Sequence, residues 1–250
     1  MPTYNIHVSA RFTKIRPQIE KIIRHGVPAE AEVIYKARNT VYRLNVDGVD
    51  LVIKSFRIPN TLNSLVYTHL RKSKAMRSYQ NAKKLQELGF HTPTPIAYGE
   101  VRVDGRLRQS YYISENLTGN NMRDWEQKPD SDALLRAFAA DIVRLHRAGV
   151  LHKDFSPGNV IYTRDENGAY RFHYIDLNRM EFGVHSRKKL MTMFRSINLD
   201  TAQTLRLAAL YAMSAKEEMK TVCDEAAEAQ AKYLALQRRK QTFKHLLCRK

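Results

Sequence analysis

Three oxygen-bearing side chains stand at a fixed spacing in the second half of the sequence. In the run His152-Lys153-Asp154-Phe155-Ser156-Pro157-Gly158-Asn159 an asparagine follows an aspartate by five residues, and a second aspartate, Asp176, follows the strand-like Tyr174-Ile175. Phosphoryl transfer from ATP needs such groups: one carboxylate orients the attacking hydroxyl, while an asparagine and another carboxylate hold Mg²⁺ on the triphosphate. The spacing therefore predicts phosphotransferase chemistry with ATP and Mg²⁺.

Each residue of this set has a predicted role. Asp154 is the candidate for the carboxylate that orients or accepts the proton of the acceptor hydroxyl, and Asn159 and Asp176 are candidate Mg²⁺ ligands because a hard cation prefers oxygen donors. We expect His152 to order the loop backbone. Lys153 either stabilises charge on the transferred phosphoryl group or is an inert exposed lysine. Single Asp and Asn residues commonly cap turns, so the prediction rests on the spaced set.

A lysine at the end of an apolar strand is the candidate phosphate ligand. Lys54 follows Leu51-Val52-Ile53, and a cation in that place points from a rigid sheet at the α- and β-phosphates of a nucleotide. The alternative is an edge lysine that discourages aggregation. The downstream motif favours the phosphate role.

The elements that must position these residues change from strands to helices along the chain. Turn signals, alternation and helical periodicity predict strands at 31–35, 40–46 and 49–56, a helix at 63–88 ending at Gly89, a hairpin around Asp104-Gly105, a helix from the N-cap Ser131 to Gly149, a hairpin with its tip at 165–168, and helices from Gly183 to Lys250.

This order predicts an α+β chain with two lobes. Residues 1–116 would form a small β-rich N-lobe with one long helix that binds nucleotide. Residues 117–250 would form a mainly helical C-lobe that carries the catalytic loop and the metal site.

The net charge of +17 is the second strong signal. Basic residues gather without acids at 51–86, 187–195 and 232–250. Such fields attract polyanions, namely nucleotide phosphates, nucleic acid or an anionic lipid surface, although general solubility is an alternative explanation. We expect no nucleic-acid partner, because the basic segments lack the interleaved aromatic residues of single-strand binders.

Cysteine usage and hydropathy suggest a reducing compartment. Cys223 and Cys248 are far apart and suggest no disulfide framework. The N-terminus lacks the apolar core of a signal peptide, and no run approaches the roughly 18 apolar residues of a membrane span. We therefore expect a cytoplasmic protein, peripheral at the inner face of the membrane if its basic surface binds lipid.

Taken together, these segments resemble the protein-kinase-like superfamily and, more narrowly, the lipopolysaccharide kinase (Kdo/WaaP) family. The resemblance covers about residues 30–200 and is carried by 53–56, 77–79, 89–95, 152–159 and 175–180. It implies that Lys54 binds phosphates, that Asp154 is the catalytic acid/base and that Asn159 and Asp176 bind metal. It also implies that Glu115 to Leu117 form the adenine-binding connector.

The chain departs from the kinase pattern in two places. A kinase usually pairs the strand lysine with a glutamate on the following helix, but here no acid occurs between Asp50 and Glu87, and Gln80 is the nearest polar stand-in. The Gly-rich loop is also missing. Lys36 and Arg38 in its place could reach phosphates with their side chains.

The resemblance implies a kinase that phosphorylates a sugar hydroxyl, on Kdo or heptose, of the lipopolysaccharide inner core. Its basic clusters would hold the lipopolysaccharide precursor or the anionic membrane surface. Two alternatives remain: an atypical RIO-like Ser/Thr protein kinase, and a catalytically weak pseudokinase scaffold, which the missing glutamate and glycines favour.

Overall fold

The computed structural model describes residues 1–56, 72–195 and 199–247 of the chain. Its contacts divide the chain into two compact units. The first comprises Met1–Thr118 together with Asp176–Asn178, and the second comprises Gly119–Ile175 and Arg179–Lys250.

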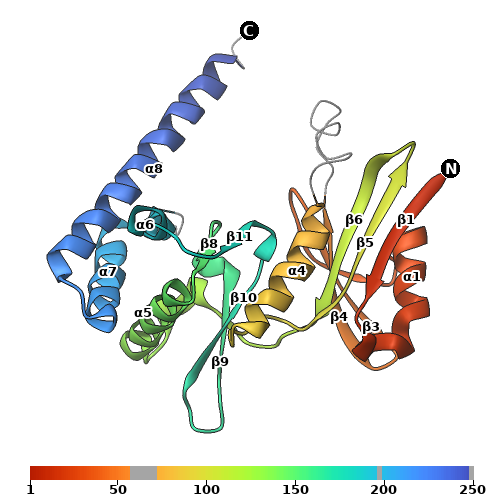
Figure 1. Ribbon diagram of the computed structural model, residues 1–250, viewed down its shortest axis with the longest axis horizontal. Coiled ribbons are helices and arrows are strands. Elements are labelled where there is room, and N and C mark those ends of the chain that lie inside the picture. Colours follow the sequence, from red (N-terminus) through yellow and green to blue (C-terminus); the bar gives the residue numbers. More distant parts are fainter. Residues whose placement is uncertain (57–71, 196–198, 248–250) are drawn as a thin grey trace. The chain divides into compact units, whose positions relative to one another are not determined.

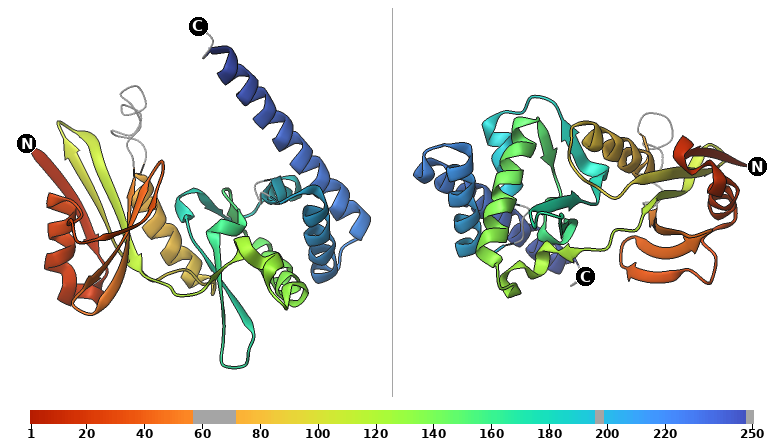
Figure 2. Two further views of the ribbon diagram at one scale, coloured as in Figure 1. Left: turned by 180° about the vertical axis from the view of Figure 1, so that it is seen from behind. Right: turned by 90° about the horizontal axis from the view of Figure 1, so that it is seen from below.

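The first unit is built on one antiparallel sheet of six strands in the order β1-β5-β6-β4-β3-β2 (Figure 1; Figure 2 gives the view from behind). The strands are β1 Pro2–Val8, β2 Glu32–Lys36, β3 Thr40–Val46, β4 Val49–Phe56, β5 Pro95–Val103 and β6 Arg106–Glu115. A short 3-10 helix, Ala10–Ile15, leads into α1, Arg16–His25, and the second helix of the unit is α4, Lys74–Glu87.

Helix α1 covers one face of this sheet. Ile19, Ile22 and Ile23 recur at helical spacing, are buried, and pack with the inward residues of β4, Leu51 and Ile53. The helix approaches β5 closely at Gly99, where a Cβ atom would lie 2.6 Å from the Ile23 side chain. A glycine is therefore required at this crossing.

Helix α4 lies on the opposite face, where it packs against β5 and β6 (Figure 1). Ser73 caps its N-terminus by accepting a hydrogen bond from Met76 N at 3.0 Å. At its other end Gly89 has a φ of +77°, in agreement with the predicted helix end. The predicted start near Asn63 lies in 57–71, outside the described residues.

The predicted strands and hairpins of this unit are confirmed. Asp47-Gly48 and Asp104-Gly105 form tight turns in which all four residues have positive φ. The sequence reasoning assigned no element to the first 30 residues, and so it missed β1 and α1.

The second unit consists mainly of helices, which confirms the predicted α+β class with β structure first and helices after it. Its helices are α5 Ser131–Arg147, α6 Arg187–Arg195, α7 Thr201–Ala215 and α8 Met219–Leu247. Its short strands are β7 Asn120–Asn121, β8 Val150–His152, β9 Val160–Arg164, β10 Tyr170–Tyr174 and β11 Met180–Phe182. β9 and β10 form the predicted hairpin, and β8 pairs with β11.

One cap prediction was wrong by a residue. Asp130, not Ser131, is the N-cap of α5, because the Asp130 carbonyl already accepts the first helical hydrogen bond from Leu134 N at 3.0 Å. The predicted apolar stripe of this helix is confirmed, since Leu134, Phe138 and Ile142 are buried.

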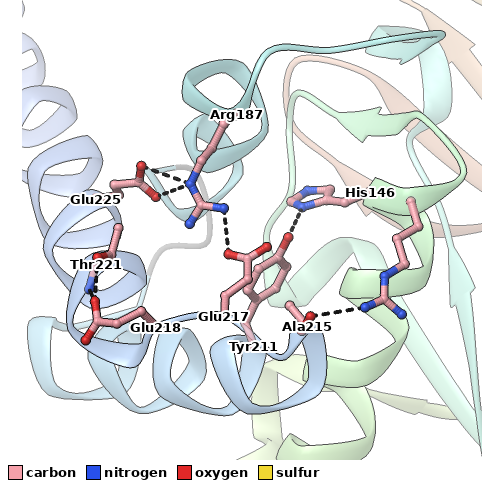
Figure 3. Close-up of polar contacts among 9 residues, drawn as sticks. His146, Arg187, Tyr211, Ala215, Glu217, Glu218, Thr221 and Glu225 are labelled. Carbon is pink, nitrogen blue, oxygen red and sulfur yellow. Dashed lines mark hydrogen bonds and ion pairs between the residues drawn. The ribbon is translucent and has the colours of Figure 1, made fainter.

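Polar side chains tie the helices of the second unit together (Figure 3). Arg187 on α6 donates to Glu217 at 2.5 Å and to Glu225 on α8 at 2.7 Å. His146 Nδ1 on α5 lies 2.9 Å from the Tyr211 hydroxyl on α7. Burial, together with the neighbouring His185, lowers the pKa of His146 to about 4, so this imidazole is neutral in the folded protein.

None of the helices in the described part of the chain has the length and apolar character needed to cross a membrane.

Candidate active site

Lys54 forms an ion pair with Asp176 inside the first unit. Side chains alternate along β4, so Lys54 points away from the core face that Leu51 and Ile53 occupy. Its Nζ lies 2.7 Å from Asp176 Oδ1, and the two side chains are 18% and 30% exposed. Lys54 and Asp176, which lie more than a hundred positions apart in the sequence and were singled out separately, are thus neighbours.

The backbone at Asp176 is held in an uncommon conformation. Its φ of +58° lies in the left-handed region, which non-glycine residues rarely adopt and which is often found at functional sites. Asn178 Nδ2 donates to Asp176 Oδ1 at 2.6 Å, and Asn81 Nδ2 on α4 donates to the Leu177 carbonyl at 2.7 Å. These bonds fix the segment 176–178 on α4 and orient the carboxylate.

More cations surround this ion pair than the sequence reasoning identified. Lys74, the first residue of α4, is half-buried, and its Nζ lies 6.0 Å from the centre of the Phe56 ring, while Lys54 Nζ lies 5.5 Å from the same centre. Burial lowers the pKa of Lys74, as do the charges of Arg38, Arg77 and Lys54, whereas Asp176 raises it. The acid-free stretch from 51 to 86 was the signal that could have revealed this cluster.

The structure does not bring Gln80 to Lys54. Gln80 lies off the buried stripe of α4, which runs through Ala75, Tyr79 and Ala82, and its side chain is exposed. Its Oε1 accepts a hydrogen bond from Lys72 at 2.8 Å. The expected replacement of the helix glutamate by Gln80 is therefore wrong, because the described carboxylate partner of Lys54 is Asp176.

The two basic residues predicted in place of a Gly-rich loop lie at the β2–β3 turn. Lys36 is exposed at the end of β2, and Arg38 is exposed in the turn itself. Only Arg38 is close enough to Lys74 to influence its pKa.

The predicted connector is anchored by its backbone. Glu115 N donates to the Thr94 carbonyl at 2.9 Å, and Asn116 N donates to the Asp50 carbonyl at 2.8 Å. The Asn116 side chain donates to Asp50 Oδ2 at 2.9 Å. Leu117 follows directly and is half-buried. These bonds give the connector a fixed start at the ends of β4 and β6.

In the second unit, the loop 152–159 is folded around a buried anchor. Phe155 is fully buried and stacks on Phe138 of α5, with ring centres 5.6 Å apart. His152 is 1% exposed, and its Nε2 lies 3.0 Å from the Ile175 carbonyl. His152 therefore contacts the backbone, as expected of a residue that orders the loop.

The same loop is closed by Asn159. Its Nδ2 donates to the Asp154 carbonyl at 2.8 Å, and its own carbonyl accepts a hydrogen bond from Ile175 N at 2.9 Å. The second bond ties the loop to the residue that precedes Asp176 in the chain. With the amide nitrogen used, Oδ1 is the donor atom that Asn159 offers to a hard cation.

Two groups of ion pairs lie around the loop. They include Arg179 and Glu181, which were not predicted from the sequence. Asp154 Oδ1 accepts from Arg179 at 2.6 Å. Glu181 binds Lys153 at 2.8 Å and Lys189 at 2.7 Å. The hydrogen bonds from these two lysines lower the pKa of Glu181 to about 2. Arg179 ends the short 3-10 helix Leu177–Arg179, and Glu181 lies in β11; both meet the loop only through folding.

The chemistry of the two predicted metal ligands, Asn159 and Asp176, suits Mg²⁺ better than a transition metal. An amide oxygen and a carboxylate are hard ligands, and Mg²⁺ commonly takes few such ligands from a protein when phosphates complete its shell. Within the described ranges no three His, Cys, Asp or Glu residues gather as a protein-only metal site would require.

Comparison with known proteins agrees with this chemistry. The sequence model of the Lipopolysaccharide kinase (Kdo/WaaP) family matches residues 30–211. The lipopolysaccharide core heptose(I) kinase WaaP of Pseudomonas aeruginosa is 28% identical over 56% of this chain and 58% of its own length. The 3-deoxy-D-manno-octulosonic acid kinase of Vibrio parahaemolyticus is 23% identical over 64% of this chain and 69% of its own length.

The chain thus spans under two thirds of the length of the heptose kinase that it matches. Among solved structures, WaaP in complex with acyl carrier protein superimposes with a TM-score of 0.61 at 19% identity, covering 92% of this chain and 97% of that one. This likeness establishes a shared kinase-like fold.

Proposed function

The chain belongs to the lipopolysaccharide kinase (Kdo/WaaP) family, and on that premise we propose that it transfers the γ-phosphoryl group of ATP to a sugar hydroxyl of the lipopolysaccharide inner core. The observation that carries the proposal is the ion pair between Lys54 and Asp176, with the aspartate backbone at a φ of +58°. The proposed phosphate ligand and the proposed metal ligand are neighbours there, which supports the nucleotide chemistry that the proposal requires.

Residues 1–116 act as the nucleotide-binding lobe in this proposal. Lys54 exchanges the Asp176 carboxylate for the α- and β-phosphates, and Lys36 and Arg38 approach the phosphates from the β2–β3 turn. The backbone of Glu115 to Leu117 receives the adenine ring. Asp176 and Asn159 are the residues that would hold Mg²⁺, which would neutralise charge on the phosphates.

Residues 117–250 supply the acceptor chemistry. Arg179 binds Asp154 Oδ1, so Oδ2 is the oxygen that accepts the hydrogen bond of the sugar hydroxyl and orients it for attack. His152 holds the loop backbone through the Ile175 carbonyl. Lys153 remains beside Asp154 and shares Glu181 with Lys189, which limits its freedom to reach the phosphoryl group.

The acceptor is proposed from the relatives and from charge. Both curated relatives are named as kinases of inner-core sugars, heptose(I) in one and 3-deoxy-D-manno-octulosonic acid in the other. The net charge of +17 suits an anionic glycolipid, and an anionic leaflet would attract the basic segments with on the order of 1 kcal/mol per Lys or Arg. We propose a site of action at the inner face of the cytoplasmic membrane.

Transfer of labelled phosphate from ATP tests this function. The full chain should label purified lipid A-linked inner core in the presence of Mg²⁺, and EDTA should abolish the labelling. A RIO-like protein kinase would label Ser or Thr of protein and leave the glycolipid unlabelled. A pseudokinase scaffold would bind nucleotide or glycolipid without labelling either, and both outcomes would overturn the proposal.

A further inference from the structure

We infer that Lys74, at the start of α4, is a ligand of the nucleotide triphosphate. On the helix where a kinase usually carries an acid, this chain would then use a cation. The inference rests on the proposed function and concerns the same site. Its ligand class is a compact polyanion of two or more linked phosphates.

The first support is the position of Lys74 relative to Lys54. The two ammonium groups lie 6.0 and 5.5 Å from the centre of the same buried ring, Phe56, one reaching it from a helix and the other from a strand. Two cations near one aromatic ring present a pair of positive charges to whatever binds beside them.

The second support is the charge balance of the cluster. Arg38 and Arg77 lie near enough to Lys74 to lower its pKa, and Asp176 is the carboxylate that opposes them. Among the described residues, the cations whose charges act on Lys74 thus outnumber the carboxylates that do so. That excess is unfavourable in the free protein and favourable once an anion of several charges enters.

The third support is the helix itself. Lys74 is the first residue of α4, after the cap Ser73, so the positive end of the helix dipole adds to the field of the cluster. The side chain of Lys74 is half-buried and fixed at the base of the helix, whereas Lys83 and Lys84 near its other end are exposed. This difference provides a matched control.

The inference has a consequence opposite to the usual kinase arrangement. If the helix needed an acid to hold Lys54, Lys74→Glu would improve nucleotide binding. If Lys74 binds phosphate, the same substitution places a negative charge against the triphosphate. Removing the charge with Lys74→Ala should also leave the free protein at least as stable, because it relieves repulsion from Arg38, Arg77 and Lys54.

Nucleotide titration calorimetry on the full chain tests the inference, with ATP, ADP and AMP as ligands and circular dichroism as the folding check. We expect Lys74→Ala to weaken the affinity for ATP on the order of tenfold, Lys74→Glu to weaken it further, and Lys84→Ala to leave it unchanged. The loss should shrink from ATP to ADP and vanish for AMP.

Equal ATP affinity in Lys74→Ala and Lys84→Ala, or tighter binding by Lys74→Glu, would overturn the role of Lys74 while leaving the proposed kinase intact. Nucleotide binding with these losses but without phosphate transfer would support Lys74 and sink the proposed reaction. A folded wild-type chain that binds none of the three nucleotides would overturn both.

Discussion

The two units handle charge in different ways. In the described part of the first unit, Lys54 pairs with Asp176, and Lys74 feels the charges of Arg38, Arg77 and Lys54 against that of Asp176. In the second unit, the charges around the loop pair with one another, Asp154 with Arg179 and Glu181 with Lys153 and Lys189.

We expect this difference to separate nucleotide binding from catalysis. An unbalanced cluster gains most from an incoming polyanion, as expected where a triphosphate binds. A balanced cluster keeps its carboxylate oriented without a ligand, as expected where a hydroxyl must be positioned. Substitutions in the second unit should therefore change turnover without changing nucleotide affinity, whereas those in the first should change nucleotide affinity and, at Lys54, turnover as well.

The largest expected effect is at Asp154. Asp154→Asn should lower phosphate transfer by about 10²- to 10⁴-fold, the range for a lost general base, while ATP affinity remains that of the wild type. Transfer assays and calorimetry on the same preparation measure both. Asp104→Asn in the β5–β6 turn is the control, because asparagine tolerates its φ of +51°. A matched loss of ATP affinity in Asp154→Asn would break the division of roles.

Acid should lower the free energy of unfolding of the second unit through protonation of His146. Its folded pKa is about 4 and its unfolded value 6.5, so the unfolded chain binds the extra proton between these values. The contribution of His146 to the free energy of unfolding is fully present above pH 6.5. It is lost as the pH falls toward 4, by up to about 3 kcal/mol.

Urea unfolding across that pH range measures the loss. His146→Gln should flatten the pH dependence of the unfolding free energy, and His25→Gln on the exposed end of α1 should leave it unchanged. The same slope in both variants would show that His146 is not the titrating group.

Lys54 should follow, with an effect on binding and turnover together. Lys54→Met removes one fixed cation from the developing charge and should lower kcat/KM for ATP on the order of 10²-fold. Lys83→Met, on the exposed face of α4, should change it little. Steady-state kinetics with varied ATP measures this effect. A Lys54→Met variant with unchanged kcat/KM would contradict a role of the first unit in nucleotide binding.

The smallest expected effect concerns the N-caps of α4 and α5. Ser73→Ala deletes the hydrogen bond to Met76 N and should cost about 1 kcal/mol of unfolding free energy. Ser131→Ala, inside the first turn of α5, should be neutral because Asp130 is the N-cap there. Thermal unfolding of the two variants compares them, and equal losses would contradict the assigned caps.

Local signals in the sequence predicted most of the fold. The hairpins follow from Asp-Gly turns between alternating strands, and α5 follows from its apolar period. The β1–α1 segment was not predicted, although Ile19, Ile22 and Ile23 have helical spacing.

Spacing along the chain singled out Asp154, Asn159 and Asp176, and the strand pattern singled out Lys54. The structure pairs Lys54 with Asp176, and the roles of all four residues stay predictions. Gln80 was wrong because the face that a helical residue presents depends on the buried stripe of α4. Arg179 and Glu181 were missed because their partners are reached through space and not along the sequence.

The proposed transfer of phosphate to the lipopolysaccharide inner core, with Asp154 as the catalytic carboxylate, can be measured on the glycolipid itself. The measurement is mass spectrometry of lipid A-core from a strain that lacks the chain, complemented with the wild type or with Asp154→Asn. We expect one core phosphate to disappear, to return with the wild type and to stay absent with Asp154→Asn. An unchanged glycolipid in the deleted strain, or full restoration by Asp154→Asn, would contradict it.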